Sequence, residues 1–295
     1  MWEQIATIIC KRHQISCDTL QRATQGENII FFVDDRFAIK IFLPLRDGFA
    51  REKAALEFAE GKFGMDVPKI THTGEIEGAS YLVMTQLVGV PAKDVWASVE
   101  TREQTEIVSR LGVALKSLHS YPAPLSELAL NRDWQKFIER QAHESVERQR
   151  ACGANPEWLE SLPAYIDARL DMLTKDKLVM LHGDMHFGNM LLSQQSGRWQ
   201  ISGLFDFGDS MCGFHEYDFV APGVLMIQGN REMQRALFSA YGYRDTEMDA
   251  NLRARLMLLT ILYECSDLRK YALRLRPEAV NLTLKELEHA LWTFE

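Results

Sequence analysis

Three polar side chains that could orient a hydroxyl group and bind a metal ion lie close together between residues 178 and 209. Asp184 and Asn189 are five residues apart across a glycine-containing loop, and Asp206 follows the next strand-like segment. If the flanking strands pair as a hairpin, all three side chains gather at one end of a sheet. One carboxylate can then accept a proton, while the amide oxygen and the second carboxylate bind a hard cation such as Mg²⁺.

A lysine on an upstream strand completes the set that phosphoryl transfer requires. In that reaction the protein does little covalent chemistry, because it positions an acceptor hydroxyl and neutralises phosphate charge with Mg²⁺ and a lysine. Lys40 ends an Ala-Ile-Lys segment, and Asp206 begins an Asp-Phe-Gly segment. With the Asp-x-x-x-x-Asn spacing, these features match the sequence signatures of kinases. Each is weak alone, but their order along the chain favours a kinase-type fold.

Other chemistries fit the same residues less well. The segment His182–His186 alternates His and Asp as a metal site does, which leaves a hydrolytic metal centre as an alternative. However, Gly183 and Gly188 argue against the strand that would point these side chains the same way. Ser210 and His215 suggest a serine hydrolase, but no Gly-x-Ser-x-Gly elbow is present. The chain also has no P-loop motif.

The stretches 182–189 and 204–209 resemble the aminoglycoside phosphotransferase family, relatives of protein kinases that phosphorylate small molecules. His-Gly-Asp stands where a protein kinase has His-Arg-Asp. The resemblance runs from about Gln25 to the C-terminus. Three further stretches are similar to hygromycin-B kinases that act on the 7″-hydroxyl: Val83–Thr85, Gln228–Glu232, and the terminal block from Leu262 to Trp292.

The resemblance implies a role for each residue of the set. Asp184 matches the catalytic aspartate, which accepts or orients the proton of the acceptor hydroxyl. Asn189 and Asp206 match the Mg²⁺ ligands. Lys40 matches the lysine on the α- and β-phosphates, and Glu52 matches the helix glutamate that orients it. The alternative for this last pair is an ion pair that only closes a lobe.

The resemblance also implies a nucleotide site at the junction of two lobes. The backbone carbonyl of Thr85 and the N–H of Leu87 are expected to bond adenine. The phosphate loop, residues 25–28, has one glycine where protein kinases have three, which leaves the choice between ATP and GTP open.

The elements expected around these residues form a bilobal, protein-kinase-like α+β fold. Residues 1–87 are expected to be a nucleotide-binding lobe with a small antiparallel sheet, and residues 90–295 a mainly helical catalytic and acceptor-binding lobe. The hinge is expected at about 84–89. Within the first lobe, hydrophobic patterning predicts helices at 2–13 and 52–63 and strands at 29–33, 37–42 and 81–85. In the second lobe, a helix is expected from Thr101 to His119, followed by helices over 132–150 and 157–175.

Acidic residues near the C-terminus are candidates for binding the acceptor. Glu264 and Asp267 are three apart, which places them on one face of a predicted helix. Asp209 is a further candidate. Clustered acids attract an ammonium-rich sugar and repel nucleic acid. The alternative for Asp267 is that it pairs with nearby basic residues on a solvated face. Asp218 is expected to be a buried helix cap and not a ligand. Tyr263 either stacks on a sugar ring or simply packs.

Composition narrows the classes of protein. The chain has 295 residues, with 33 Lys and Arg against 41 Asp and Glu, for a net charge of −8. This balance argues against a nucleic-acid-binding protein. No apolar run approaches the ~20 residues of a membrane span. Five scattered cysteines without a Cys-x-x-Cys motif suit reduced thiols in the cytoplasm.

The leading hypothesis is therefore a cytoplasmic ATP-dependent phosphotransferase, with GTP as a possible donor. It would act on a hydroxyl of a hygromycin B-like aminoglycoside or aminocyclitol antibiotic and confer resistance. We expect a monomer or weak dimer without nucleic-acid or membrane partners. The alternatives are a kinase for choline, homoserine or a sugar, and a catalytically inactive nucleotide-binding module.

Overall fold

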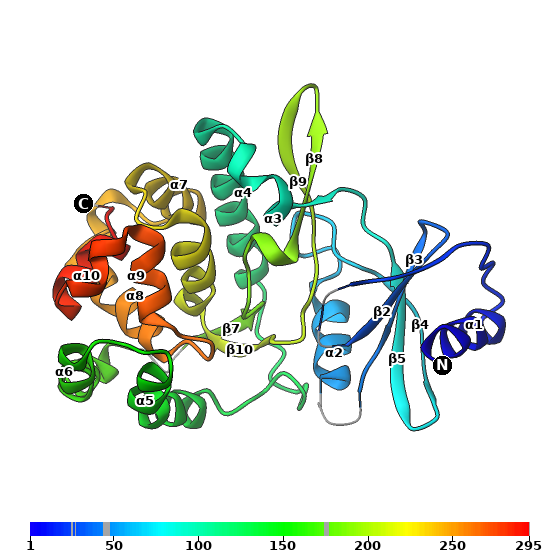
Figure 1. The fold of residues 1–295 in the computed structure, drawn as a ribbon, viewed down its shortest axis with the longest axis horizontal. Helices are drawn as coiled ribbons and strands as arrows, with labels where there is room; N and C mark the ends of the chain where they lie inside the picture. The colour runs from blue at the N-terminus through cyan, green and yellow to red at the C-terminus, as the bar shows by residue number, and fades with distance from the viewer. Residues whose placement is uncertain (25, 27, 44–47, 174–176, 295) are drawn as a thin grey trace.

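The computed structural model describes residues 1–24, 26, 28–43, 48–173 and 177–294. A twisted antiparallel sheet with two helices lies at one end of the molecule, and a mainly helical part lies at the other (Figure 1). The predicted α+β class, with a sheet in the N-terminal part and helices in the C-terminal part, is confirmed. No helix among the described residues has the length and apolar character that crossing a membrane requires.

The N-terminal sheet has the strand order β1-β2-β3-β5-β4, and every neighbouring pair is antiparallel. Its strands are β1 (Leu20–Arg22), β2 (Ile29–Val33), β3 (Phe37–Ile41), β4 (Ile70–Ile76) and β5 (Ala79–Thr85). The strands predicted at 29–33, 37–42 and 81–85 are thus confirmed to within two residues. Lys40 lies in the central strand, opposite Ile30 on one side and Leu82 on the other.

Two helices cover opposite faces of this sheet. Helix α1 (Trp2–Arg12) packs on the face that carries Ile39 and Ile41. Helix α2 (Phe49–Ala59) packs on the face that carries Leu82. Successive side chains of a strand point to opposite faces. Lys40 therefore points toward α2 and away from α1.

Helix α2 lies earlier in the chain than predicted. The sequence suggested residues 52–63, whereas the helix begins at Phe49 and ends at Ala59. Gly61 and Gly64 have φ values of +70° and +69°. This left-handed conformation is open to glycine and ends a right-handed helix, so the apolar Phe63 lies in the loop that follows.

The helical part begins after β6 (Val90–Pro91). Its longer helices are α4 (Thr101–His119), α5 (Trp134–Ala151), α6 (Pro156–Asp167), α7 (Arg231–Tyr241), α8 (Ala250–Leu262), α9 (Leu268–Leu275) and α10 (Leu284–Leu291). The short helix α3 (Ala92–Val95) precedes them. Helices α4 and α7 lie in close contact at Gly112, where a Cβ atom would stand 2.4 Å from the carbonyl oxygen of Leu237. The helix predicted at 157–175 ends at Asp167 and is followed by the 3-10 turn η2 (Leu170–Met172).

The segment with the densest chemistry forms two small sheets inside the helical part. Strand β7 (Leu178–Leu181) pairs with β10 (Met211–Phe214). Strands β8 (Met190–Gln195) and β9 (Arg198–Leu204) form the predicted hairpin, and the 3-10 turn η3 (Phe187–Asn189) leads into it. The loop between β7 and β8 and the loop after β9 therefore emerge beside each other, and these two loops carry the predicted site residues.

Candidate active site

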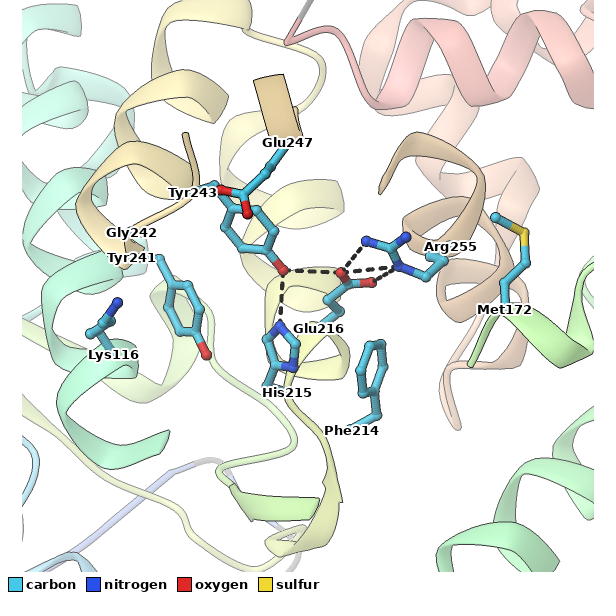
Figure 2. Close-up of a pocket in the computed structure, with 10 residues that line it drawn as sticks. All are labelled: Lys116, Met172, Phe214, His215, Glu216, Tyr241, Gly242, Tyr243, Glu247 and Arg255. Atoms are coloured by element: carbon cyan, nitrogen blue, oxygen red, sulfur yellow. Dashed lines mark hydrogen bonds and ion pairs between the residues drawn. The ribbon is translucent and has the colours of Figure 1, made fainter. Parts of the chain in front are cut away.

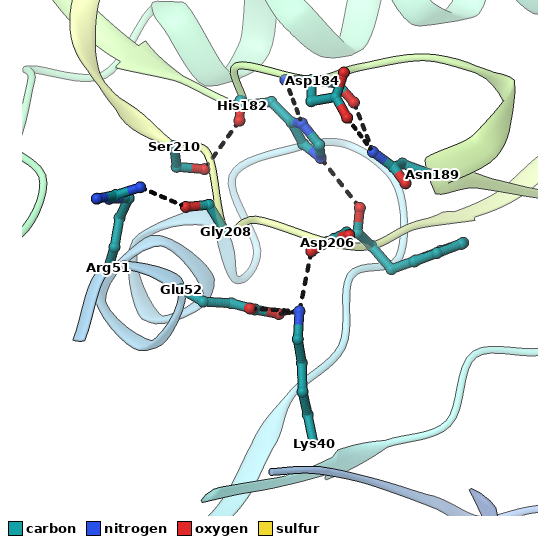
Figure 3. Close-up of polar contacts among 10 residues, drawn as sticks. Lys40, Arg51, Glu52, His182, Asp184, Asn189, Asp206, Gly208 and Ser210 are labelled. Carbon is teal, nitrogen blue, oxygen red and sulfur yellow. Dashed lines mark hydrogen bonds and ion pairs between the residues drawn. The ribbon is translucent and has the colours of Figure 1, made fainter. Parts of the chain in front are cut away.

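The side chain of Lys40 reaches both a helix glutamate and the loop after β9. Its Nζ lies 2.8 Å from Oε1 and 2.6 Å from Oε2 of Glu52, and 3.0 Å from Oδ1 of Asp206 (Figure 3). Lys40 and Glu52 are almost fully buried, whereas half of the Asp206 side chain is exposed. Burial alone would lower the pKa of Lys40, but the carboxylates of Glu52 and Asp206 raise it. The lysine is therefore a buried positive charge that is held between a buried and a half-exposed carboxylate.

The loop after β9 is shaped to turn Asp206 toward Lys40. Asp206 has a φ of +64°, which is a strained conformation for a residue other than glycine. The loop is fastened to α2, because Arg51 donates to the carbonyl oxygen of Gly208 at 3.0 Å. Arg51 therefore contacts the loop directly, and its neighbour Glu52 contacts it through Lys40.

Asp184 is surrounded by hydrogen-bond donors from three directions. Asn189 Nδ2 lies 3.0 Å from Oδ2 of Asp184 and 2.8 Å from its backbone oxygen. His186 Nε2 lies 3.3 Å from Oδ2, and the Tyr263 hydroxyl lies 2.8 Å from Oδ1. Burial alone would raise the pKa of Asp184, but the hydrogen bonds from His186 and Tyr263 lower it to about 2. The carboxylate is charged at neutral pH.

A buried aspartate holds the loop that carries Asp184. Asp218 accepts the backbone N–H of His182 at 2.9 Å and that of Gly183 at 2.8 Å. It also lies 3.2 Å from Nε2 of His119. The prediction that Asp218 caps a helix is wrong: its carboxylate binds the backbone of the loop that carries Asp184. The sequence carries no local signal for this contact, because residues 182 and 218 meet only through the pairing of β7 with β10.

Gly183 allows the two functional loops to touch. Its φ is +88°, and a Cβ atom there would lie 2.5 Å from the backbone oxygen of Asp209. The imidazole of His182 lies beneath the same loops, with Nε2 3.3 Å from the carbonyl oxygen of Phe205 and Nδ1 3.3 Å from the backbone N–H of Asp184. The His-Gly-Asp sequence is therefore explained by packing around Asp184.

The donor set suits a magnesium ion that is shared with phosphate groups. Asn189 uses its amide nitrogen on Asp184, which leaves its amide oxygen for a cation, and Asp206 is a half-exposed carboxylate. Within the part of the chain that the structure describes, no cluster of three or more His, Cys, Asp or Glu side chains could hold a metal ion alone. Mg²⁺ characteristically takes one or two protein ligands together with phosphate oxygens and water, so these residues fit it.

The segment predicted to bind adenine lies between the N-terminal sheet and the β8–β9 hairpin. The backbone N–H groups of Thr85 and Gln86 are bonded to the carbonyl oxygens of Lys69 and Arg36. The side chain of Leu87 packs on β9, since a Cβ atom on Gly203 would lie 2.7 Å from it. In the predicted phosphate loop, residues 25 and 27 lie outside the described residues.

The acidic residues predicted to bind the acceptor do not form one helical face. Helix α8 ends at Leu262 and α9 begins at Leu268, so Glu264 and Asp267 lie in the connecting segment. Asp267 is the N-cap of α9 and accepts the backbone N–H of Lys270 at 2.8 Å. The helix prediction is wrong here because Asp267 supplies a helix start and not a helix interior.

Glu264 and Asp209 differ in their surroundings. Glu264 is paired with Arg140 at 3.3 Å and with Arg132 at 3.9 Å. Asp209 is exposed and stands near other acids. Burial of part of its carboxyl group, followed by the charges of Asp184 and Asp206, raises the pKa of Asp209. Of the candidate acceptor residues, Asp209 thus has the most negative surroundings.

A separate pocket of about 340 Å³ is lined by residues from α4, α7, α8 and the 3-10 turn η4 (His215–Phe219). Figure 2 shows Glu216 in this pocket between Arg255 and Tyr243, with His215 on the other side of the tyrosine hydroxyl. Glu216 is 1% exposed, and its carboxylate accepts three hydrogen bonds from the Arg255 guanidinium. The predicted catalytic, nucleotide and metal residues do not line this pocket.

Comparisons with known proteins agree with this arrangement. A family model described as the phosphotransferase enzyme family matches residues 20–256. No curated protein matches the chain.

Several solved structures have the same fold. The GDP complex of wild-type aminoglycoside 2′-phosphotransferase-IIIa has a TM-score of 0.70 at 18% identity, and the match covers 98% of this chain and 97% of that chain. The streptomycin–ATP–APH(2″)-IIa ternary complex has a TM-score of 0.63 at 18% identity, with 96% and 97% covered. A thermostable mutant of aminoglycoside phosphotransferase APH(4)-Ia, in a ternary complex with ADP and hygromycin B, has a TM-score of 0.61 at 14% identity, with 97% of both chains covered.

Proposed function

Since this chain belongs to the phosphotransferase enzyme family, we propose that it transfers the γ-phosphate of ATP to a hydroxyl of an aminoglycoside or aminocyclitol antibiotic. The observation that carries this proposal is the contact of Lys40 with both Glu52 and Asp206, which are 12 and 166 residues away in the sequence. The contact supports the proposal, because kinase chemistry requires a cation that binds phosphate beside a carboxylate that binds the metal ion.

Each residue has a proposed task in the reaction. Lys40, oriented by Glu52, binds the α- and β-phosphates, and Asn189 with Asp206 would hold Mg²⁺. When bound, the metal ion offsets the negative charge that develops on the transferred phosphoryl group. Thr85 and Leu87 bind adenine through their backbone atoms. GTP is the alternative donor.

Asp184 is proposed to accept a hydrogen bond from the acceptor hydroxyl and to orient its oxygen toward the γ-phosphate. A carboxylate with a pKa of about 2 is a weak base. Phosphoryl transfer proceeds through a loose transition state in which positioning and charge stabilisation supply most of the catalysis. A weakly basic carboxylate that is held rigidly is suited to orient the hydroxyl and to take its proton late in the reaction.

The charge around Asp209 supports a cationic acceptor. Asp184, Asp206 and Asp209 lie in adjacent loops, and burial, followed by repulsion from Asp184 and Asp206, raises the pKa of Asp209. An ammonium-bearing sugar would relieve that repulsion. The named neighbours bound to streptomycin and to hygromycin B have the same fold, which makes these compounds reasonable probes. Modification of such an antibiotic in the cytoplasm would give resistance.

One observation favours a second candidate, a kinase for a small metabolite. Arg132 and Arg140 neutralise Glu264, so the far side of the acceptor region is less acidic than the sequence suggested. An acceptor that carries both an ammonium and a carboxylate, such as homoserine, would suit this mixture of charges.

A panel of acceptors distinguishes the two candidates. The protein is incubated with Mg²⁺ and either ATP or GTP, together with hygromycin B, streptomycin, kanamycin, gentamicin, choline, homoserine or a hexose, and phosphorylated products are detected by ³¹P NMR. We expect product with at least one of the four antibiotics. Turnover of only a metabolite would contradict the antibiotic proposal. Nucleotide binding without any product would indicate the inactive module, a result that also contradicts it.

A further inference from the structure

We propose that Tyr263 is a positioning residue that fixes the orientation of Asp184 and connects this carboxylate to the acceptor side of the cleft. The inference rests on the proposed catalytic role of Asp184. Tyr263 is the residue directly after α8, and its side chain is 4% exposed. It is therefore placed to act on Asp184 from beneath the cleft without occupying the acceptor site.

The contacts of Asp184 divide between its two carboxylate oxygens. His186 and Asn189 approach Oδ2, at 3.3 Å and 3.0 Å. Tyr263 approaches Oδ1, at 2.8 Å. Because the donors act on opposite oxygens, the Tyr263 hydroxyl limits rotation of the carboxylate about its Cβ–Cγ bond. Limiting this rotation keeps a lone pair directed at the acceptor hydroxyl.

The tyrosine has a choice of two acceptors for its one proton. Its hydroxyl oxygen lies 2.8 Å from Asp184 Oδ1 and 3.0 Å from the backbone oxygen of Gly183. A hydrogen bond to a charged carboxylate is stronger than one to a neutral carbonyl. The hydroxyl therefore donates to Asp184 while the carboxylate is charged, and the Gly183 oxygen is available to it once Asp184 has taken up a proton.

Tyr263 is itself fixed by a second tyrosine. The two rings of Tyr217 and Tyr263 have centroids 5.2 Å apart, and the backbone N–H of Glu264 donates to the Tyr217 hydroxyl at 3.1 Å. Glu264 follows Tyr263 directly and is one of the acidic residues proposed to bind the acceptor. The turn that begins at Tyr263 thus contacts the catalytic carboxylate with one residue and the acceptor region with the next.

The test compares Tyr263→Phe with wild type in steady-state kinetics, using the acceptor that the panel identifies, or water as acceptor in ATP hydrolysis if none is found. We expect kcat to fall about tenfold or more, because a hydrogen bond to a charged group is lost. The KM for the nucleotide should not change. The loss should therefore fall on kcat and not on nucleotide binding.

Tyr271→Phe is the matched control. The Tyr271 hydroxyl donates to the carbonyl oxygen of Cys265, in the same connecting segment, at 3.2 Å. Removing it perturbs the segment without removing a donor to Asp184, so kcat should stay near wild type. If Tyr271→Phe lowers kcat as much as Tyr263→Phe, the effect is a general loosening of the segment and the inference is overturned.

A binding measurement gives a result that does not depend on turnover. The affinity for ATP with Mg²⁺ is measured by calorimetric titration, and we expect Tyr263→Phe to bind the nucleotide as wild type does. A wild-type kcat in Tyr263→Phe, or a loss of nucleotide affinity as large as its loss of kcat, overturns the inference. Failure of the proposed function gives a different result, because Asp184→Ala would then be as active as wild type. Failure of the inference about Tyr263 leaves Asp184→Ala inactive.

Discussion

The loop around Asp184 and the region proposed to bind the acceptor are built in different ways. In the loop around Asp184, each functional group is held by buried neighbours: Asp218 accepts backbone N–H groups, and Tyr263 donates to the carboxylate. In the acceptor region, Glu264 is neutralised by surface arginines and Asp267 caps a helix. Asp209 is exposed and close to other acids.

This difference indicates which part of the reaction is fixed by the fold. Phosphoryl transfer depends on placing a few charges accurately, and buried hydrogen bonds provide that accuracy. Exposed ion pairs contribute little energy and rearrange easily. If the proposed roles hold, the interior determines the chemistry of transfer, and a few exposed side chains determine which acceptor binds.

The largest effect should come from removing the catalytic carboxylate. Asp184→Ala is expected to lower turnover by about 10²–10⁴, the usual contribution of a positioned acid–base group, while leaving nucleotide affinity nearly unchanged. Asp206→Ala is the matched variant and should abolish Mg²⁺-dependent nucleotide binding as well. Steady-state kinetics and calorimetric titration with and without Mg²⁺ measure both. Normal turnover by Asp184→Ala would refute its assigned role.

Disturbing the support of the loop should affect stability and turnover together. Asp218→Asn replaces a buried carboxylate that accepts from two backbone N–H groups, and we expect a loss on the order of 3 kcal/mol in the free energy of unfolding. Urea denaturation measures this loss. Asp133→Asn is the control, because Asp133 is the N-cap of α5 and asparagine caps equally well. Equal stabilities for the two variants would show that Asp218 does not support the loop.

The partly buried His215 should make the free energy of unfolding depend on pH below neutrality. Burial lowers the pKa of His215 to about 3, well below its value of about 6.5 in an unfolded chain. The unfolded state then binds more protons between these values, so stability is complete above pH 6.5 and decreases as the pH falls toward 3. From pH 7 to pH 5 this loss is on the order of 2 kcal/mol.

His215→Phe should remove most of this dependence on pH. Denaturant midpoints at pH 7 and pH 5, compared between the variant and wild type, provide the measurement. If the two proteins lose stability in parallel, another group is responsible for the change.

The smallest effects should distinguish the acids of the acceptor region. Asp267→Ala is expected to cost about 1 kcal/mol of stability through loss of the α9 cap, with no change in acceptor KM. Glu264→Gln should leave stability nearly unchanged and raise the KM for a cationic acceptor by up to about fivefold, the range of an exposed ion pair. Thermal denaturation and acceptor kinetics check both. The reverse pattern would return Asp267 to the acceptor site.

Much of the fold could be predicted because its signals are local. Short apolar runs located β2, β3 and β5, and apolar residues at helical spacing located α1 and α4. The boundaries of α2 were wrong because Phe63 continued the apolar pattern while Gly61 ended the helix. The division at residues 84–89 stays a proposal, and the five-strand sheet ends at Thr85 while the next sheet begins at Val90.

The candidate site was predictable to the extent that it depends on short motifs. The Asp-Phe-Gly segment named Asp206, which contacts Lys40, and the spacing of five residues named Asp184 and Asn189, which contact each other. Their roles in catalysis and in metal and nucleotide binding remain predictions. The cap predicted for Asp218 was wrong, and the contact of Tyr263 with the loop was missed, because these residues act on a loop about 35 and 80 residues away and no local pattern records such a contact.

The sequence by itself determined which chemical groups are available and in what order they occur, because strand periodicity and loop motifs are properties of neighbouring residues. Only the tertiary structure decided which donors reach each oxygen of Asp184 and which acids are consumed by caps and arginines. The physical reason is that a hydrogen bond or ion pair forms between groups a few ångströms apart, and that proximity arises from packing between elements distant in the chain.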